Sequence, residues 1–259
     1  MSIRARPSFR EIQYGWLSYI SRVEIPSESE CVAIIPARSG SKGVPHKNSR
    51  LMRGASLTER AVRVALSSGL FSDVVISTDD PQLLGQKWPL TVRAMPRPPE
   101  LAGDTVHASQ IVLYCLRTDA SLENGRYVFM LLPTSPLRTV EQLRQARDLL
   151  ASGAPSVVAV TMVGKQLNNL RFMDHQGSLH APFEFDLHEQ RQTQEPLWAV
   201  TGSVFAAHRD TLLTAETFHV ANARGLAVDG TSGLDVNDWQ DWSRAEEFID
   251  SETRSRDSG

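Results

Sequence analysis

The 259-residue sequence predicts an α/β protein built on a doubly wound, mostly parallel sheet. Short uninterrupted apolar runs, such as CVAIIP (31–36) and YVFMLL (127–132), are typical of strands buried on both faces of a parallel sheet. These runs alternate with amphipathic segments of about 10–13 residues, which is the spacing of β-α-β units. We therefore expect helices to cover both faces of one parallel sheet.

The composition excludes several classes of protein. Thirty acidic and 27 basic residues give a net charge near −3, so the chain has no polybasic character suited to nucleic acid or an anionic membrane. No apolar run reaches the roughly 18–20 residues of a membrane-spanning helix. The two cysteines, Cys31 and Cys115, lack zinc-ligand spacing, and the N-terminal residues lack the apolar segment of a signal peptide. We expect a cytoplasmic protein.

The first elements follow an N-terminal extension over residues 1–30, and residues 31–259 form the remaining domain. A strand over 31–36 ends at Pro36, and a helix over 56–68 stops at Gly69. A second strand covers 73–78, and an acidic turn and a short helix over 81–86 come after it.

The middle of the chain continues the alternation. A short strand over 90–94 precedes a proline-rich segment, 96–99, that forbids regular structure. The next elements expected are a helix over 105–117, a strand over 127–132, a helix over 140–150 and a strand over 156–163.

Residues 165–195 break this alternation. Short alternating pieces flank Asp174–Gly177, which reads as a hairpin turn, so this stretch is predicted to be a small β-rich excursion serving as a lid or a subunit contact. Residues 197–207 return to the core, and a last helix begins close to Asp238, its predicted N-cap.

The loop after the first strand, ARSGSKGVPHKN (37–48), carries the chemistry. Ligands of α/β sheets bind at the carboxyl ends of the strands, where this loop lies. Gly40 and Gly43 would let the backbone approach an anion, and Arg38, Lys42 and Lys47 add positive charge. The loop has neither the P-loop spacing nor the dinucleotide GxGxxG spacing. We predict a phosphate-binding loop of another kind.

IIPARSGSKGVPHKN resembles the signature of the sugar-acid cytidylyltransferases, above all the CMP-N-acylneuraminate synthetases, with CMP-Kdo synthetases as more distant relatives. VVISTDD, RPPELAGDT, LLPTSPLRT and LDVNDWQDWSRAEEFI are similar to further family segments, in order, over roughly residues 31–250. The resemblance implies a Rossmann-like nucleotidyltransferase fold, with residues 165–195 as a dimerisation element of a homodimer.

The resemblance also implies a reaction: an acceptor oxygen attacks the α-phosphorus of CTP, CMP is transferred and pyrophosphate leaves. The catalytic residues it implies are Arg38, Lys42 and Asp235. The nucleotide-binding residues it implies are Arg38, Ser39, Gly40, Ser41, Lys42, Lys47, Asn48 and Arg97. Asp235 matches the principal Mg²⁺ ligand, and Asn237 stands where relatives carry a second aspartate. Mg²⁺, held by one or two carboxylates with phosphate oxygens and water, is the implied cofactor.

The acceptor side departs from the family pattern. Leu132 replaces a glutamine, Ala108 replaces a serine, and Thr201 lies in a segment that has lost an arginine and an asparagine. Arg191 still matches a family arginine that could meet an anionic acceptor. Because polar partners of a nine-carbon sugar acid are missing, the acceptor is not expected to be ordinary N-acetylneuraminate.

Two acceptors remain open at this point. One is a modified 2-keto-3-deoxy sugar acid related to sialic, legionaminic or pseudaminic acid, and the other is a small phosphonate such as phosphonoformate. A different hypothesis is a non-catalytic nucleotide-binding sensor, in which Asn237 marks lost metal chemistry.

Overall fold

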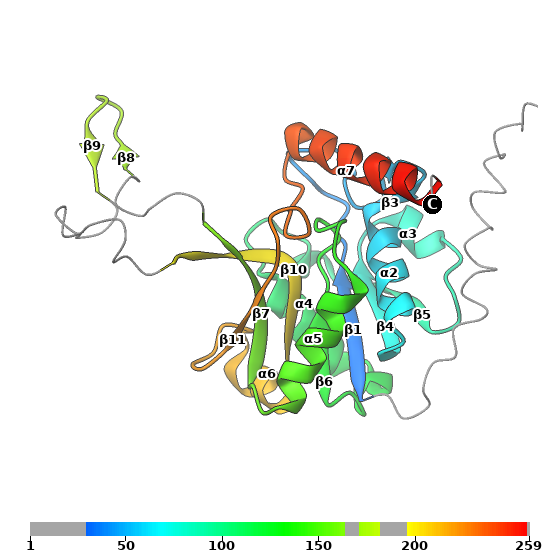
Figure 1. Ribbon diagram of the computed structural model, residues 1–259. Coiled ribbons are helices and arrows are strands. Elements are labelled where there is room, and N and C mark those ends of the chain that lie inside the picture. The colour runs from blue at the N-terminus through cyan, green and yellow to red at the C-terminus, as the bar shows by residue number, and fades with distance from the viewer. Residues whose placement is uncertain (1–29, 164–170, 182–195, 258–259) are drawn as a thin grey trace, which may run out of the picture.

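The computed structural model describes residues 30–163, 171–181 and 196–257 (Figure 1). Within these residues seven strands form one mixed sheet in the order β11-β7-β10-β6-β1-β4-β5. The strands are β1 (Cys31–Pro36), β4 (Phe71–Thr78), β5 (Val92–Pro96), β6 (Tyr127–Met130), β7 (Ser156–Met162), β10 (Trp198–His208) and β11 (Arg224–Ala227). Within this seven-stranded sheet, as far as the structure describes it, only β10 runs antiparallel to its neighbours, so the predicted mostly parallel α/β sheet is confirmed.

Helices cover both faces of the sheet (Figure 1). One face packs against α2 (Leu57–Ser68), α3 (Pro81–Gly85) and α5 (Val140–Ala151). The other face packs against α4 (Ala108–Thr118) and α6 (Arg209–Ala215). Successive residues of β1 alternate between the two cores, with Ala33 and Ile35 in the first and Val32 and Ile34 in the second. This is why the run is apolar without interruption.

Local sequence signals set the helix ends. Ser56 caps α2 and forms a reciprocal capping box with Glu59, and Gly69 ends the helix at a φ of 65°. Asp238 accepts hydrogen bonds from the amides of Gln240 and Asp241, so it caps α7 (Trp239–Asp257), as expected.

Several boundaries differ from the sequence-based prediction. β4 begins at Phe71, β6 stops at Met130, and α4 begins at Ala108, because His107 rather than Thr105 forms its N-cap. The proline-rich segment is more regular than expected: Pro96 ends β5, and a 3-10 turn, η1 (Pro99–Leu101), follows. Proline is tolerated there because β5 is an edge strand of the sheet.

Some elements had no sequence prediction. They are the hairpin of β2 (Leu51–Met52) and β3 (Ala55–Ser56), the turn η2 (Ala120–Leu122), helix α6 and strand β11. The β2–β3 hairpin supplies Met52 to a third apolar cluster, in which Val44 and Leu137 pack against Trp242 of α7. The last helix therefore holds the loop after β1 in place.

The predicted excursion at 165–195 is described only over residues 171–181. Strands β8 (Phe172–Met173) and β9 (Leu179–His180) pair around the predicted turn at Asp174–Gly177. The amides of Gln176 and Ser178 donate to the Asp174 carboxylate, which fixes the turn. The N-terminal extension over 1–29 lies outside the described residues.

Candidate active site

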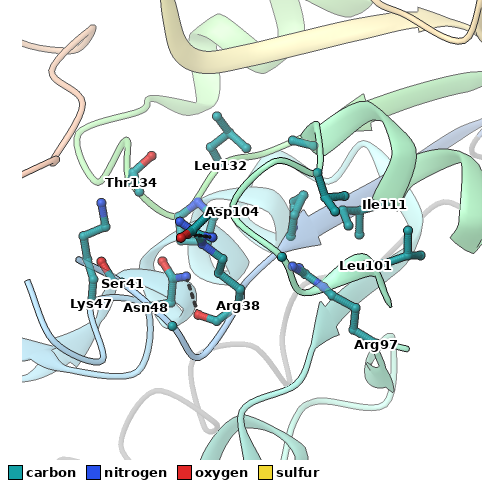
Figure 2. Close-up of a pocket in the computed structure, with 16 residues that line it drawn as sticks. Arg38, Ser41, Lys47, Asn48, Arg97, Leu101, Asp104, Ile111, Leu132 and Thr134 are labelled. Atoms are coloured by element: carbon teal, nitrogen blue, oxygen red, sulfur yellow. Dashed lines mark hydrogen bonds and ion pairs between the residues drawn. The ribbon is translucent and has the colours of Figure 1, made fainter. Parts of the chain in front are cut away.

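A cavity lies where the strand order reverses, between the carboxyl ends of β1 and β6. Its volume is about 260 Å³, slightly below the roughly 300–1,000 Å³ of most small-molecule sites. Three segments form its wall: the loop after β1, the loop after β6, and the segment between β5 and α4 (Figure 2). The lining residues include Arg38, Gly40, Ser41, Lys47, Asn48, Arg97, Asp104, Ala108, Ile111, Leu132 and Thr134.

Asn48 and Arg97 form the polar floor of the cavity. The Asn48 amide nitrogen donates to the Arg38 carbonyl at 2.9 Å, and the Arg97 guanidinium donates to the Ser77 carbonyl at 2.7 Å. Both side chains are buried, and Asn48 Oδ1 and Arg97 Nε have no hydrogen-bond partner in the described parts of the chain. Burial lowers the pKa of Arg97. Two residues of the cavity wall therefore each carry a buried polar atom without a partner, and satisfying such atoms is one role that a polar ligand could have here.

Asp79 anchors the glycine-containing loop. Its carboxylate accepts from the Ser39 amide at 2.8 Å and from the Ser39 hydroxyl at 2.6 Å. Burial raises the pKa of Asp79, but the hydrogen bonds from Ser39 outweigh burial and leave that pKa below its ordinary value. Ser39, a predicted nucleotide ligand, thus points at Asp79 and is not in the cavity wall.

Asp80 anchors the same loop at a second point. It caps α3 through the Gln82 amide and accepts from the Ser49 hydroxyl at 2.7 Å. The sequence indicates no more than a turn at the end of a strand for these two aspartates, because their partners are about 30 to 40 residues away.

The loop is also tied to the segment before α7. Lys47 Nζ donates to the Val236 carbonyl at 2.6 Å, and burial lowers the Lys47 pKa against the opposing charge of Asp235. A Cβ on Gly43 would lie 1.9 Å from the Asn237 carbonyl oxygen. The close contact with Asn237 is therefore one reason why residue 43 is a glycine, and an anion contact of its backbone stays a prediction. Gly40 has nothing within 4 Å of such a Cβ and lines the cavity.

Arg38 and Lys42, the predicted catalytic cations, meet at Asp104. Arg38 Nη1 lies 2.6 Å from Asp104 Oδ1, and Lys42 Nζ lies 2.8 Å from Asp104 Oδ2 (Figure 2 shows the Arg38 pair). The Lys42 side chain is 85% exposed. The hydrogen bonds from Lys42 and Arg38 lower the pKa of Asp104, so this carboxylate stays ionised. The sequence showed Asp104 within a family-like segment but gave it no role.

Asp235 and Asn237, the predicted metal ligands, lie beside the cavity and not in its wall. The Val236 amide donates to the carbonyl of the cavity residue Thr134 at 2.7 Å, which fixes the segment. Asp235 Oδ1 is buried with no hydrogen-bond partner among the described residues. Asp235 Oδ2 accepts from the side-chain nitrogen Nδ2 of Asn237 at 3.1 Å. One carboxylate oxygen without a partner suits Mg²⁺, which uses few protein ligands. Asn237 holds Asp235 in this arrangement.

Arg138 supports the cavity residue Leu132 and had no role in the sequence-based prediction. Its guanidinium is buried and donates to the carbonyls of Leu132, Gly202 and Ser203. β10 breaks its register with β7 between Val200 and Phe205, so Arg138 bonds carbonyls at this irregularity. Burial lowers the pKa of Arg138, while the charge of Asp235 acts in the opposite direction. The signal was the arginine that ends LLPTSPLR.

The structure does not bring the four predicted acceptor residues together at the cavity. Leu132 and Ala108 line the cavity together with Leu101, Val106 and Ile111, which makes one wall apolar. Thr201 is buried outside the cavity wall, and its hydroxyl donates to the Ala159 carbonyl at 3.3 Å. Arg191 lies outside the described residues. Gly202 of β10 packs closely against both the loop after β6 and the segment before α7. A Cβ at this position would lie 2.8 Å from Ser135 Oγ and 3.2 Å from Asp235 Oδ1.

Comparison with known families decides the class of protein. Residues 32–172, more than half of the chain, match the family model described as "Cytidylyltransferase". The chain belongs to this cytidylyltransferase family. The predicted nucleotidyltransferase class of enzyme is thereby confirmed.

Individual relatives are similar over most of the chain. CMP-N,N'-diacetyllegionaminic acid synthase of Legionella pneumophila is 29% identical over 226 residues, which cover 85% of this chain and 96% of the relative. N-acylneuraminate cytidylyltransferase of Escherichia coli is 27% identical over 219 residues, and the match covers 84% of this chain. The match spans 51%, about half, of the length of that longer cytidylyltransferase.

Solved structures share the fold. A CMP:2-keto-3-deoxy-manno-octonic acid synthetase complexed with CTP superposes with a TM-score of 0.61 at 15% identity, over 86% of this chain and 99% of the other. The 4-diphosphocytidyl-2C-methyl-D-erythritol synthase of Anaerococcus prevotii gives a TM-score of 0.59 at 12% identity, over 85% and 96%. The cytidylyltransferase therefore has the predicted Rossmann-like nucleotidyltransferase fold. In the described parts of this cytidylyltransferase, no helix has the length and apolarity to cross a membrane.

Proposed function

We propose that this enzyme transfers CMP from CTP to a 2-keto-3-deoxy sugar acid of the sialic acid class and releases pyrophosphate. The observation that carries the proposal is the cavity where the strand order reverses. The polar residues of its floor lie next to a loop that carries Arg38 and Lys42. The cavity is too small to enclose a nucleoside triphosphate. We expect the base to enter it and the phosphates to extend towards the exposed Lys42.

The unpartnered groups of the floor suit cytosine. Cytosine presents an amino donor beside carbonyl and ring-nitrogen acceptors. Asn48 Oδ1 can accept from the amino group, and Arg97 Nε can donate to an acceptor on the same edge. Uracil has a carbonyl in place of the amino group, so it would leave Asn48 Oδ1 unpaired, which costs about 1–3 kcal/mol.

Arg38 and Lys42 suit the charge that develops during transfer. A bond forms between the acceptor oxygen and the α-phosphorus, and the bond from that phosphorus to the bridging oxygen of the leaving pyrophosphate breaks. Cations positioned beside those oxygens stabilise the negative charge that develops on the leaving pyrophosphate. The Asp79 and Asp80 anchors hold the loop so that these side chains start from a defined backbone.

We further propose that Asp235 is the principal ligand of Mg²⁺, with Asn237 supporting it. The unpartnered Asp235 Oδ1 is the observation behind this. When bound there, the ion would offset the negative charge of the triphosphate. Asn237 would orient Asp235 through its amide nitrogen.

We propose a modified sugar acid as acceptor and not N-acetylneuraminate itself. Leu132 and Ala108 give the cavity apolar side chains where polar groups occur in the family pattern. The similarity to a synthase of a CMP-activated diacetyllegionaminic acid supports an acceptor of this size and charge. Arg191 is proposed to meet its carboxylate.

We propose a cytoplasmic homodimer. Cys31 and Cys115 are both buried and are not joined in a disulfide, which suits a reducing compartment. Large apolar side chains are exposed on the described hairpin and on the ends of β7 and β10, namely Met162, Phe172, Met173, Leu179, Trp198 and Val200. A second copy would cover them, and sedimentation of the wild type against Trp198→Asp measures this directly.

Pyrophosphate release tests the proposed function. Protein, CTP and Mg²⁺ are mixed with legionaminic, pseudaminic, N-acetylneuraminic and 2-keto-3-deoxyoctonic acids and with phosphonoformate. Release with a sugar acid is expected. Turnover with phosphonoformate alone would overturn the sugar-acid assignment, and CTP binding without turnover in every mixture would favour the non-catalytic sensor.

A further inference from the structure

Asp104 places a carboxylate on the two cations that the proposed function assigns to the phosphates. One oxygen lies 2.6 Å from Arg38 Nη1, and the other lies 2.8 Å from Lys42 Nζ. Each oxygen thus contacts one cation, as two oxygens of a bound phosphate would. Figure 2 shows the carboxylate beside the Arg38 guanidinium at the cavity.

The contact joins two separate parts of the chain. Arg38 and Asp104 are 66 residues apart, and the short segment that holds Asp104 also contributes Leu101, Gly103 and Val106 to the cavity wall. The ion pairs therefore connect this wall to the loop after β1. An anion bound by Arg38 and Lys42 would have to lie against the Asp104 carboxylate or displace it, because like charges in contact repel.

Because all three side chains are exposed to water, a bound anion can readily displace the Asp104 carboxylate from Arg38 and Lys42. Arg38, Lys42 and Asp104 are 35%, 85% and 50% exposed. Ion pairs that remain this accessible to water are weak. A polyanion with several charges can therefore outcompete Asp104, yet it binds less tightly than it would to unpaired cations.

We infer that Asp104 is an internal competitor for the phosphate site, which pairs with Arg38 and Lys42 when the site is empty and weakens the binding of both CTP and pyrophosphate. This inference rests on the proposed function. Its value to the enzyme is product release: when pyrophosphate leaves, Asp104 takes back the two cations. Asp104 acts through Arg38 and Lys42, so it is a positioning residue and not a catalytic one.

Direct binding of inorganic pyrophosphate, with no acceptor and no added metal, tests this by titration calorimetry. Asp104→Asn keeps the size of the side chain and removes its charge. We expect it to bind pyrophosphate about threefold to tenfold more tightly than the wild type, the range set by weak exposed pairs. CTP affinity should rise in the same direction. Asp104→Glu, which can still reach the cations, should stay close to the wild type.

Glu100→Gln is the matched control. Glu100 lies four residues before Asp104 and is exposed, and its substitution by glutamine removes one negative charge, as Asp104→Asn does. Its pyrophosphate affinity should stay within about twofold of the wild type, since an exposed charge at a distance is screened. An equal gain in Glu100→Gln would show that net charge, and not the Asp104 contact, is responsible.

A double variant separates competition from a structural effect. In a Lys42→Ala background, Asp104→Asn should tighten pyrophosphate binding less than it does in the wild type, because one of its two partners is gone. Unchanged or weaker binding by the single Asp104→Asn variant would overturn the inference while leaving the proposed function intact. If neither the wild type nor Asp104→Asn binds pyrophosphate or CTP, both are wrong.

Discussion

The two walls of the cavity are built in different ways. On the polar side, Asn48 and Arg97 are each held by a hydrogen bond to a backbone carbonyl. On the other side, Leu101, Ile111 and Leu132 offer only apolar surface. A polar wall with fixed, partly unpaired groups selects a ligand by hydrogen bonding, whereas an apolar wall selects by shape and discriminates less strongly. If the proposed function holds, we expect hydrogen bonds to select the nucleotide strictly, and shape to select the acceptor less strictly.

The largest effect is expected next to the polar side, at Asp235. Asp235→Asn removes the carboxylate charge with little change in shape, so activity should fall by about 10³-fold, equivalent to several kcal/mol of lost charge stabilisation. Steady-state kinetics with varied Mg²⁺ measures it. Asp238→Asn is the control, because asparagine still caps α7 and should preserve activity. Full activity of Asp235→Asn would refute the metal assignment.

Removing Lys42 should have the next largest effect. Lys42→Ala takes away a cation that we propose acts on the phosphates, so kcat should fall about 10²-fold, as for loss of one oxyanion donor. CTP binding should weaken much less, because the floor residues remain. Rapid-quench kinetics and CTP titration separate the two quantities, with the exposed Lys87→Ala as control. A loss confined to CTP affinity would place Lys42 in binding alone.

Substitution of the two loop glycines by alanine should change different properties of the enzyme. Gly43→Ala puts a Cβ 1.9 Å from the Asn237 carbonyl, so the free energy of unfolding should fall by about 1–3 kcal/mol or more. Gly40→Ala meets nothing within 4 Å and should leave stability unchanged but weaken CTP binding. Urea denaturation and CTP titration of both variants test this. Equal stability of the two variants would contradict the backbone contact.

The smallest effect is expected on the apolar wall. Leu132→Gln places an amide in the cavity, so the ratio of kcat/KM for N-acetylneuraminate to that for the preferred acceptor should rise about tenfold. Leu132→Met conserves volume without adding a polar group and should leave the ratio unchanged. A ratio that does not move in Leu132→Gln would separate this wall from acceptor choice.

Much of the site could be predicted because its signals are local. Pro36 ends a buried strand, and the glycines and cations that follow occupy the carboxyl end of that strand in any parallel sheet. Eight residues proposed from the sequence do line the cavity: Arg38, Gly40, Ser41, Lys47, Asn48, Arg97, Ala108 and Leu132. Their individual roles stay predictions.

Thr201 shows where this reasoning fails. It lies within the irregular stretch of β10 between Val200 and Phe205, and only the packing of that stretch decides that its hydroxyl faces Ala159 and not the cavity. The antiparallel course of β10 and the strand β11 were not predicted for the same reason: pairing partners are not encoded in the periodicity of either strand.

The sequence by itself determined the alternation of strands and helices, the ends of α2, and the position of a cationic loop after β1, since each depends on neighbours within a few residues. Only the tertiary structure decided that Gly43 packs on Asn237, that Lys47 bonds Val236, and that Asp104 pairs with Arg38 and Lys42. Those contacts join segments that are about 60 to 195 residues apart. Such contacts form only when the sheet has brought the ends of its strands together.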